Sequence, residues 1–283
     1  MAVEELKKTL VLGHRNPDTD SICSAICYAG FKHQLTGENY EPCRAGNVNP
    51  ETQYVLDYFK LKAPRLVENV KTQVKDIEIR KTKGVSRGIS LKNAWGLMQE
   101  NNVVTLPCVT EEGLLEGVIT IGDITKSYMN LYDSSIISKA CTKYANILDT
   151  LEGSMVVGDS EAYFDRGKVL IAAANPDLME NYIEKHDLVL GNRYESQLCA
   201  IEMEAGCIIV CEGAGVSLTI RKLAQERGCA VITTPYDTYT TARLINQSMP
   251  ISYFMTKENI IEFSEEDYLD DIREIMASKR HRN

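Results

Sequence analysis

Residues 10–29, LVLGHRNPDTDSICSAICYA, decide the fold at the amino-terminal end of this chain. The apolar run at residues 9–13 predicts a buried strand, and Pro17 ends it. Apolar residues then recur at helical spacing from Ile22 to Ala29. The stretch therefore predicts a strand, a short turn and a helix, the opening of a parallel sheet.

Three side chains that bind metal ions, His14, Asp18 and Asp20, lie on the predicted turn. Open parallel sheets bind ligands beyond the carboxyl ends of their strands, and the turn follows such an end. One imidazole with two carboxylates suits a divalent ion such as manganese, cobalt or zinc, and this spacing allows the carboxylates to serve two adjacent ions. The alternative is that Asp20 or Ser21 caps the helix and His14 is incidental, but capping explains one oxygen rather than three ligands.

The composition of the chain limits the kinds of protein that it can be. A chain of 283 residues with 44% hydrophobic and 25% charged residues is typical of a soluble globular protein with two or more domains. No apolar run is long enough to span a bilayer, and the start MAVEELKK is too polar for a secretory signal, so we expect a cytoplasmic protein. Nine cysteines without a CxxC pair indicate reduced core residues. The net charge of −9 argues against a general nucleic-acid surface.

The segment GHRNPDTDS, residues 13–21, resembles the first motif of the DHH phosphoesterase superfamily, most closely that of family II inorganic pyrophosphatases. The resemblance implies that His14 and Asp18 bind one metal ion and that Asp20 binds its neighbour. The later ligands of that family, a DHH triplet among them, find no counterpart in this chain, so the remaining catalytic residues are unknown. The other histidines, none in such a triplet, are His33, His186 and His281.

Residues 1–65 alternate strand, helix, strand and helix, which predicts the first part of a DHH-type parallel sheet. The alternation then stops, and residues 66–129 resemble a CBS repeat. The pattern there predicts a strand at 75–79, a helix at 90–102, strands at 103–109 and 115–121, and a helix from Gly122.

The segment GVITIGDI, residues 117–124, carries the resemblance to CBS domains. It implies that Thr120 and Asp123 hold the ribose of a nucleotide, and the amides that open the following helix would lie near a phosphate. The basic loop at 80–87 is a further candidate for phosphate contact. The alternative for Asp123 is a helix cap without a ligand, and a solvated loop is the alternative for 80–87.

Residues 130–247 resemble a DRTGG domain. Gly191, Asn192 and Arg193 stand where that family often has Gly-Asp-Arg, and residues 212–215 stand where it often has Thr-Gly-Gly. Four apolar strands alternating with helices predict a parallel sheet covered on both faces. The predicted strands are 169–174, 188–192, 207–213 and 230–234, and the predicted helices are 177–185, 195–204, 217–228 and 238–246.

Residues 248–283 resemble the first half of a second CBS repeat, with a Met-rich opening, a strand and the amphipathic helix 264–279. We expect the chain to stop within this repeat, leaving Ile272, Ile275 and Met276 uncovered. The expected fold class is thus α/β: a partial DHH-type parallel sheet, a CBS repeat (α+β), a DRTGG domain with a parallel sheet, and a partial second CBS repeat.

This order of domains resembles family II inorganic pyrophosphatases in which a regulatory region interrupts the catalytic domain. The resemblance implies hydrolysis of diphosphate to two phosphates with two Mn²⁺ or Co²⁺ ions, Mg²⁺ on the substrate, regulation by AMP, ADP or ATP at the CBS repeats, and a homodimer. Two other hypotheses stay open: a non-catalytic nucleotide-sensing and dimerising module, and a DHH-type oligonucleotide phosphodiesterase.

Overall fold

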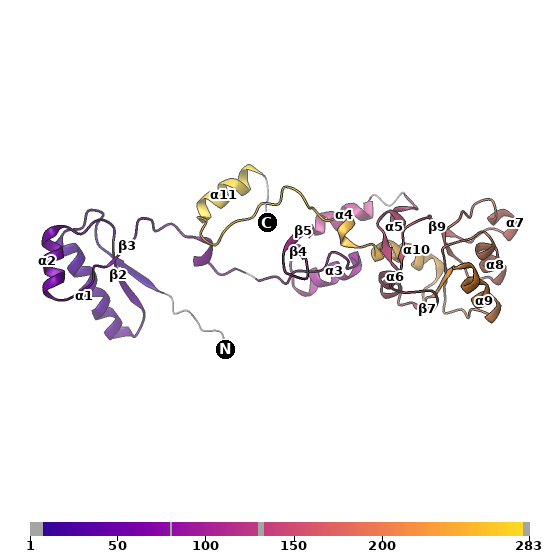
Figure 1. The fold of residues 1–283 in the computed structure, drawn as a ribbon, viewed down its shortest axis with the longest axis horizontal. Coiled ribbons are helices and arrows are strands. Elements are labelled where there is room, and N and C mark those ends of the chain that lie inside the picture. Colours follow the sequence, from indigo (N-terminus) through magenta and orange to yellow (C-terminus); the bar gives the residue numbers. More distant parts are fainter. Residues whose placement is uncertain (1–7, 80, 130–132, 280–283) are drawn as a thin grey trace. The chain divides into compact units, whose positions relative to one another are not determined.

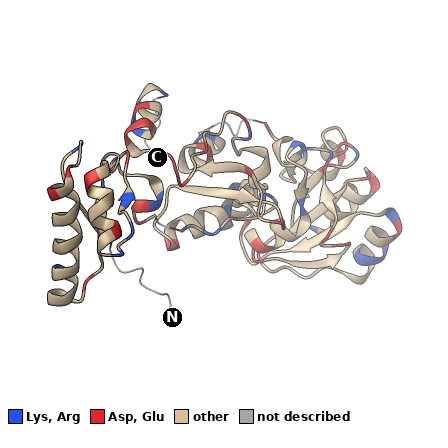
Figure 2. Cartoon of the chain, turned by 60° about the vertical axis from the view of Figure 1, so that its left-hand side comes forward, with Lys and Arg blue, Asp and Glu red and all other residues tan. Residues whose placement is uncertain are grey.

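The computed structural model of the chain describes residues 8–79, 81–129 and 133–279 (Figure 1). The chain divides into two compact units, one from residues 1–79 and 263–283 and the other from residues 80–262. Within the described residues, no helix has the length and apolar character needed to cross a membrane. Lys and Arg are interspersed with Asp and Glu along the chain (Figure 2).

The first unit opens with a three-stranded parallel sheet in the order β1-β2-β3, of which the first two strands were predicted and the short third strand was not. Its elements are β1 (Thr9–Leu12), α1 (Thr19–Thr36), β2 (Tyr40–Arg44), α2 (Pro50–Tyr58) and β3 (Arg65–Leu66). Both helices lie on one side of the strands (Figure 1), which agrees with right-handed crossovers that advance in one direction across the sheet. The helix α1 buries Ile22, Ala25 and Ala29.

The end of β1 and the start of α1 are in close contact. A Cβ atom on Gly13 would lie 1.9 Å from the Ser21 hydroxyl oxygen, so a larger residue does not fit there without rearrangement. A Cβ atom on Gly46, after β2, would lie 2.5 Å from the carbonyl oxygen of Arg15. Glycines that follow two strands thus allow the backbone around the turn to pack tightly.

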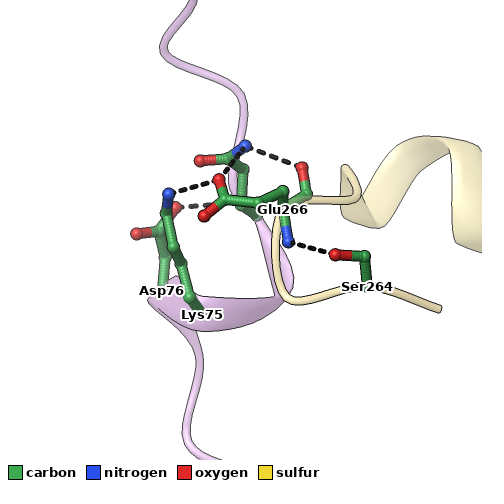
Figure 3. Close-up of polar contacts among 5 residues, drawn as sticks. Lys75, Asp76, Ser264 and Glu266 are labelled. Carbon is green, nitrogen blue, oxygen red and sulfur yellow. Dashed lines mark hydrogen bonds and ion pairs between the residues drawn. The ribbon is translucent and has the colours of Figure 1, made fainter.

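Residues 73–76 pair with residues 264–268 (Figure 3). Lys75 forms an ion pair with Glu266, and the Gln73 amide donates to the Glu266 carbonyl at 2.7 Å. The predicted strand at 75–79 is wrong, because residues Val74–Asp76 form a 3-10 turn, η1. The Asp76 carboxylate accepts from the backbone N–H of Gln73 at 2.9 Å and closes that turn, an effect of one side chain that strand patterning does not reveal.

The helix α11 (Leu269–Ser278) follows this pairing and has no buried residue. Ile275 is 40% exposed, as the expectation of an uncovered face requires, while Ile272 and Met276 are half-buried. The strand predicted before this helix is wrong. In its place are a 3-10 turn, η3 (Ile251–Tyr253), and a single bridge from Thr256 to Val118.

The second unit begins with a layer that we name the CBS-like layer. It comprises α3 (Leu91–Glu100), β4 (Thr105–Val109), β5 (Leu115–Thr120) and α4 (Ile121–Met129). The two strands form an antiparallel pair, and α3 begins at the cap residue Ser90, whose hydroxyl accepts from the Asn93 amide at 3.1 Å. These four elements agree with the sequence prediction within two or three residues at their ends.

The rest of the second unit is built around a five-stranded sheet, which we name the DRTGG-like sheet, in the order β7-β12-β11-β10-β9. The four strands predicted from the sequence run parallel, and β7 is an antiparallel edge strand that the sequence analysis missed. The strands are β7 (Ser154–Val157), β9 (Val169–Ile171), β10 (Leu188–Leu190), β11 (Cys207–Val210) and β12 (Ala230–Thr233).

Helices cover both faces of the DRTGG-like sheet (Figure 1). The crossover helices are α7 (Pro176–Met179), α8 (Tyr194–Glu202) and α9 (Leu218–Arg227), and α7 is much shorter than predicted. The opposite face carries α6 (Tyr144–Thr150), α10 (Thr238–Leu244) and the 3-10 turn η2 (Ile245–Ser248). Further short elements that the sequence analysis missed are α5 (Ile136–Lys139), β6 (Thr142–Lys143) and β8 (Tyr163–Phe164).

Alternate residues of the central strands enter two different hydrophobic cores. Leu188 and Leu190 face one core, while Val189, between them, faces the other. The second core lies against α7, α8 and α9. The first core is larger, because it continues without a break into the CBS-like layer through residues such as Met98 and Ile119. Residues 80–262 therefore form one body with a shared interior.

The shared core predicts that the two parts of residues 80–262 unfold together. Ile147 on α6 is fully buried in this core, so Ile147→Ala should lower the free energy of unfolding by about 2–5 kcal/mol. Trp95, the only tryptophan, lies on α3 in the CBS-like layer, and its fluorescence in a urea titration should report the full shift. Leu218→Ala, at a 74% exposed position, is the control. An unshifted Trp95 transition in Ile147→Ala would contradict a shared core.

Burial also predicts which thiols react. Desolvation raises the pKa of Cys108 to about 11 and that of Cys229 to about 12, whereas Cys27 and Cys141 are exposed. Because the thiolate is the nucleophile, Cys27 and Cys141 should react with a disulfide reagent at pH 8 long before the buried pair. Mass mapping of the modified peptides checks this order, and early labelling of Cys229 would refute it.

Candidate functional site

The metal-binding candidates lie where β1 passes into α1. His14 follows the strand, and its Nε2 atom is 3.4 Å from Oδ1 of Asp18. Both side chains are mostly exposed, at 58% for His14 and 63% for Asp18. The structure thus places an imidazole nitrogen and a carboxylate oxygen side by side at the carboxyl end of a parallel strand, where an ion from solvent has access to both.

Asp18 has a second role as the cap of α1. Its Oδ1 accepts a hydrogen bond from the Ser21 amide at 2.8 Å. That bond is the main cause that lowers the pKa of Asp18, and the neighbouring His14 lowers it further. The carboxylate is therefore ionised and fixed in direction. The alternative reading from the sequence placed a cap at Asp20 or Ser21, whereas the cap is Asp18, whose backbone is extended at the residue before the helix.

Asp20 lies in the first turn of α1, where its Oδ1 accepts from the Ser24 hydroxyl at 3.4 Å. Among residues 8–79, 81–129 and 133–279, no group of three or more His, Cys, Asp and Glu side chains is placed to hold one ion. The structure brings His14 and Asp18 together but does not join Asp20 to them. Binding of a neighbouring metal ion by Asp20 stays a prediction.

The donor set fits a transition metal in part. Imidazole nitrogen and carboxylate oxygen are ligands that Mn²⁺ and Co²⁺ accept, but two or three donors fill only part of a coordination shell. The Ser21 hydroxyl, at the base of the turn, is buried and has no hydrogen-bond partner among the described residues. The described residues thus offer only part of a ligand set, and metal binding at this turn stays a prediction.

The nucleotide candidates Thr120 and Asp123 are hydrogen-bonded to each other. The Thr120 hydroxyl donates to Asp123 Oδ2 at 2.7 Å, and the Thr120 amide donates to the same oxygen at 3.0 Å. The Asp123 amide in turn donates to the Thr120 hydroxyl oxygen at 3.2 Å. This reciprocal pattern is a capping box at the start of α4, so the residues have a structural role whether or not a ribose binds there.

The loop before α3 gives less support for phosphate contact. Arg87 is already paired with Glu116 at 3.1 Å, and Arg80 lies outside the described residues. A cavity of about 580 Å³ beside this loop is also lined by Glu111 and Glu112. Three carboxylates against one paired guanidinium disfavour a phosphate in this cavity.

The turn after β11 has the strain expected of a tight chain reversal. Glu212 and Gly213 both have positive φ angles, of 61° and 63°. Asn192 secures this turn from the end of β10: its side-chain oxygen accepts from the Cys211 amide at 2.8 Å, and its amide donates to Glu212 at 3.2 Å. Asn192 was expected only as a family position, and no sequence pattern indicated this bridging role between strands.

Comparison with known proteins shows first which domain families the chain contains. The CBS domain family matches residues 74–130, and the DRTGG domain family matches residues 146–248. A crystal structure of the CBS and DRTGG domains of the regulatory region of Clostridium perfringens pyrophosphatase, complexed with its activator diadenosine tetraphosphate, is 35% identical in sequence. It superposes with a TM-score of 0.69 over 74% of this chain and 92% of that one. The chain is thus a CBS and DRTGG protein.

Similarity to curated proteins shows which enzymes carry this pair of domains. The chain is 39% identical over 274 residues to a cobalt-dependent inorganic pyrophosphatase of Clostridium perfringens, covering 96% of this chain and 50% of that enzyme. It is 29% identical over 282 residues to a probable manganese-dependent inorganic pyrophosphatase of Thermotoga maritima, covering 99% and 51%. The chain belongs to the family of metal-dependent inorganic pyrophosphatases with CBS and DRTGG domains. It spans about half the length of the curated relatives it matches.

The capping box at α4 makes a prediction about stability. Asp123→Ala removes the acceptor of two hydrogen bonds from Thr120 and should lower the free energy of unfolding by about 1 kcal/mol. Asp123→Asn keeps an oxygen acceptor and should lose less. Lys126→Ala, at an exposed position of the same helix, is the control in the urea titration. Equal stability of Asp123→Ala and the parent chain would rule out the capping role.

Proposed function

We propose that this chain supplies one side of the metal centre and the nucleotide-sensing region of an enzyme that hydrolyses diphosphate to two phosphates. The observation that carries the proposal is the placement of His14 beside Asp18, at 3.4 Å, at the carboxyl end of β1. Similarity to metal-dependent inorganic pyrophosphatases over 96% of the chain supports it. The DHH-type start, the CBS repeat and the DRTGG domain would divide near residues 65, 129 and 247.

In this proposal His14 and Asp18 hold one Mn²⁺ or Co²⁺ ion and Asp20 holds a second, while Mg²⁺ accompanies the substrate. When bound, such ions neutralise the charge of diphosphate and lower the pKa of a coordinated water. Asp18 contributes an ionised carboxylate that the Ser21 amide keeps in place, so the ligand is oriented before the ion arrives. The close packing of Gly13 on Ser21 leaves no room for a side chain at position 13.

The regulatory part of the proposal places an adenine nucleotide, AMP, ADP or ATP, at Thr120 and Asp123. Binding would exchange the mutual hydrogen bonds of these side chains for bonds to a ribose. The nucleotide changes activity only if it binds one arrangement of the enzyme more tightly than another. We also propose a homodimer, because α11 has no buried residue and its apolar face needs a partner, and a cytoplasmic location.

A second candidate function is a nucleotide-sensing module without catalytic activity. The observation that favours it is that the described part of the chain holds no three-ligand metal group. The two candidates differ in metal binding, since a module with a vestigial turn would bind AMP but not Mn²⁺.

Two substitutions at Asp18 separate the metal ligand from the helix cap. Asp18→Asn keeps an oxygen that accepts from the Ser21 amide but removes the charge, so α1 should stay folded while the affinity for Mn²⁺ falls by about tenfold or more. Asp18→Ala should lose both the cap and the metal. Electron paramagnetic resonance measures free Mn²⁺ in a titration, and circular dichroism follows the helix.

Asp177→Asn, an exposed aspartate in the second unit, is the matched control and should bind Mn²⁺ as the parent chain does. Mn²⁺ affinity that is the same in Asp18→Asn and the parent chain, or no binding by the parent chain, would reject the metal role and leave the sensing module.

A further inference from the structure

A cavity of about 270 Å³ lies where the CBS-like layer meets the helices of the DRTGG-like sheet. Its walls come from three elements, α4, α10 and η2. The lining residues are Tyr128, Thr240, Arg243, Leu244 and Gln247. None of them takes part in the metal turn or in the hydrogen bonds between Thr120 and Asp123, so this cavity has no role in the function proposed above.

Arg243 brings a positive charge to the cavity that no carboxylate neutralises. Among the described residues, no Asp or Glu oxygen lies within 4.0 Å of its guanidinium, whereas Arg87 and Arg65 each have a glutamate partner at 3.1 Å. Its guanidinium carbon lies 5.7 Å from the centre of the Tyr239 ring, which orients the group without cancelling its charge. The nearby Asp237 carboxylate is engaged by the amide and hydroxyl of Thr240.

The rest of the cavity is mostly apolar with one polar edge. Tyr128 offers a ring face and Leu244 an aliphatic surface. The Gln247 side chain hydrogen-bonds the Tyr128 hydroxyl, and the charge of Arg243 also acts on this phenol; both oppose the desolvation that raises the pKa of Tyr128. Aromatic ring, amide and guanidinium therefore converge on one small space.

We propose that this cavity binds a planar aromatic anion. The ring of the ligand lies against Tyr128 and Leu244, its anionic group meets Arg243, and the Gln247 amide pairs with polar atoms at the edge of the ring. An unpaired guanidinium beside an apolar floor recognises this chemistry, because it gains a charge-assisted bond without breaking an ion pair. The volume suits one ring system with its substituent.

Two sources supply such a ligand, a nucleoside monophosphate or an aromatic carboxylate. The site is separate from Thr120 and Asp123, because Tyr128 lies five residues beyond Asp123 on α4, which is about 7.5 Å along the helix axis. A ligand in the cavity touches α4 on one side and α10 on the other, so it links the helix that carries Asp123 to the DRTGG-like sheet.

The test uses the full chain with Asp123→Ala, which silences the other nucleotide candidate, and isothermal titration with AMP, adenosine and benzoate. At least one of the two anions should bind, and Arg243→Gln should weaken that binding by about tenfold, the loss expected for one charge-assisted bond. Adenosine, which lacks the anion, should bind weakly and equally to both proteins. Comparison of AMP with benzoate identifies the source.

Tyr128→Leu keeps an apolar floor but removes the ring and the partner of Gln247, and it should also weaken binding. Lys126→Gln removes an exposed charge from the same helix and is the matched control, with unchanged affinity expected. Failure of both AMP and benzoate to bind would overturn the proposal, as would equal affinities of the Arg243→Gln and parent proteins. Neither outcome bears on the separate proposal that the amino-terminal turn binds Mn²⁺.

Discussion

The hydrophobic core that runs from the CBS-like layer into one face of the DRTGG-like sheet is the constraint on which the second unit depends. Buried residues of α3, β4, β5 and α4 pack in the same cluster as alternate residues of β10, β11 and β12. Neither part keeps a complete interior when separated from the other, because each would expose the apolar face that the partner covers. A perturbation on α4 therefore reaches the sheet through packed side chains rather than through a flexible linker.

At the amino-terminal end a different constraint applies. The turn between β1 and α1 is fixed by close backbone packing around Gly13 and by the cap that Asp18 provides. The same carboxylate is the one that we propose as a metal ligand, so the cap that starts α1 also sets the direction of this side chain. The imidazole of His14 lies beside it, and the described residues bring no third His, Cys, Asp or Glu side chain to this pair.

Sequence patterns predicted the elements with strong periodicity. The strands around Val189 and Ile208 are short apolar runs bounded by turns, and they form the centre of the sheet as expected. Residues 136–164 were missed because their helices and strands are only two to seven residues long, too short for a period to show. The 3-10 turn at Val74–Asp76 depends on one carboxylate, and the approach of His14 to Asp18 depends on the conformation of the turn between them. Residue spacing could identify His14 and Asp18 as candidate ligands but could not give the distance between their side chains.

The most direct test of the central claim, that residues 80–262 respond to a nucleotide as one body, is native-state hydrogen exchange with and without AMP. A ligand that binds only the folded form slows the slowest amides of the whole cooperative unit by the same factor. The shared core predicts equal slowing in α3 of the CBS-like layer and in β11 of the DRTGG-like sheet. Slowing confined to the CBS-like layer, with β11 unchanged, would contradict it.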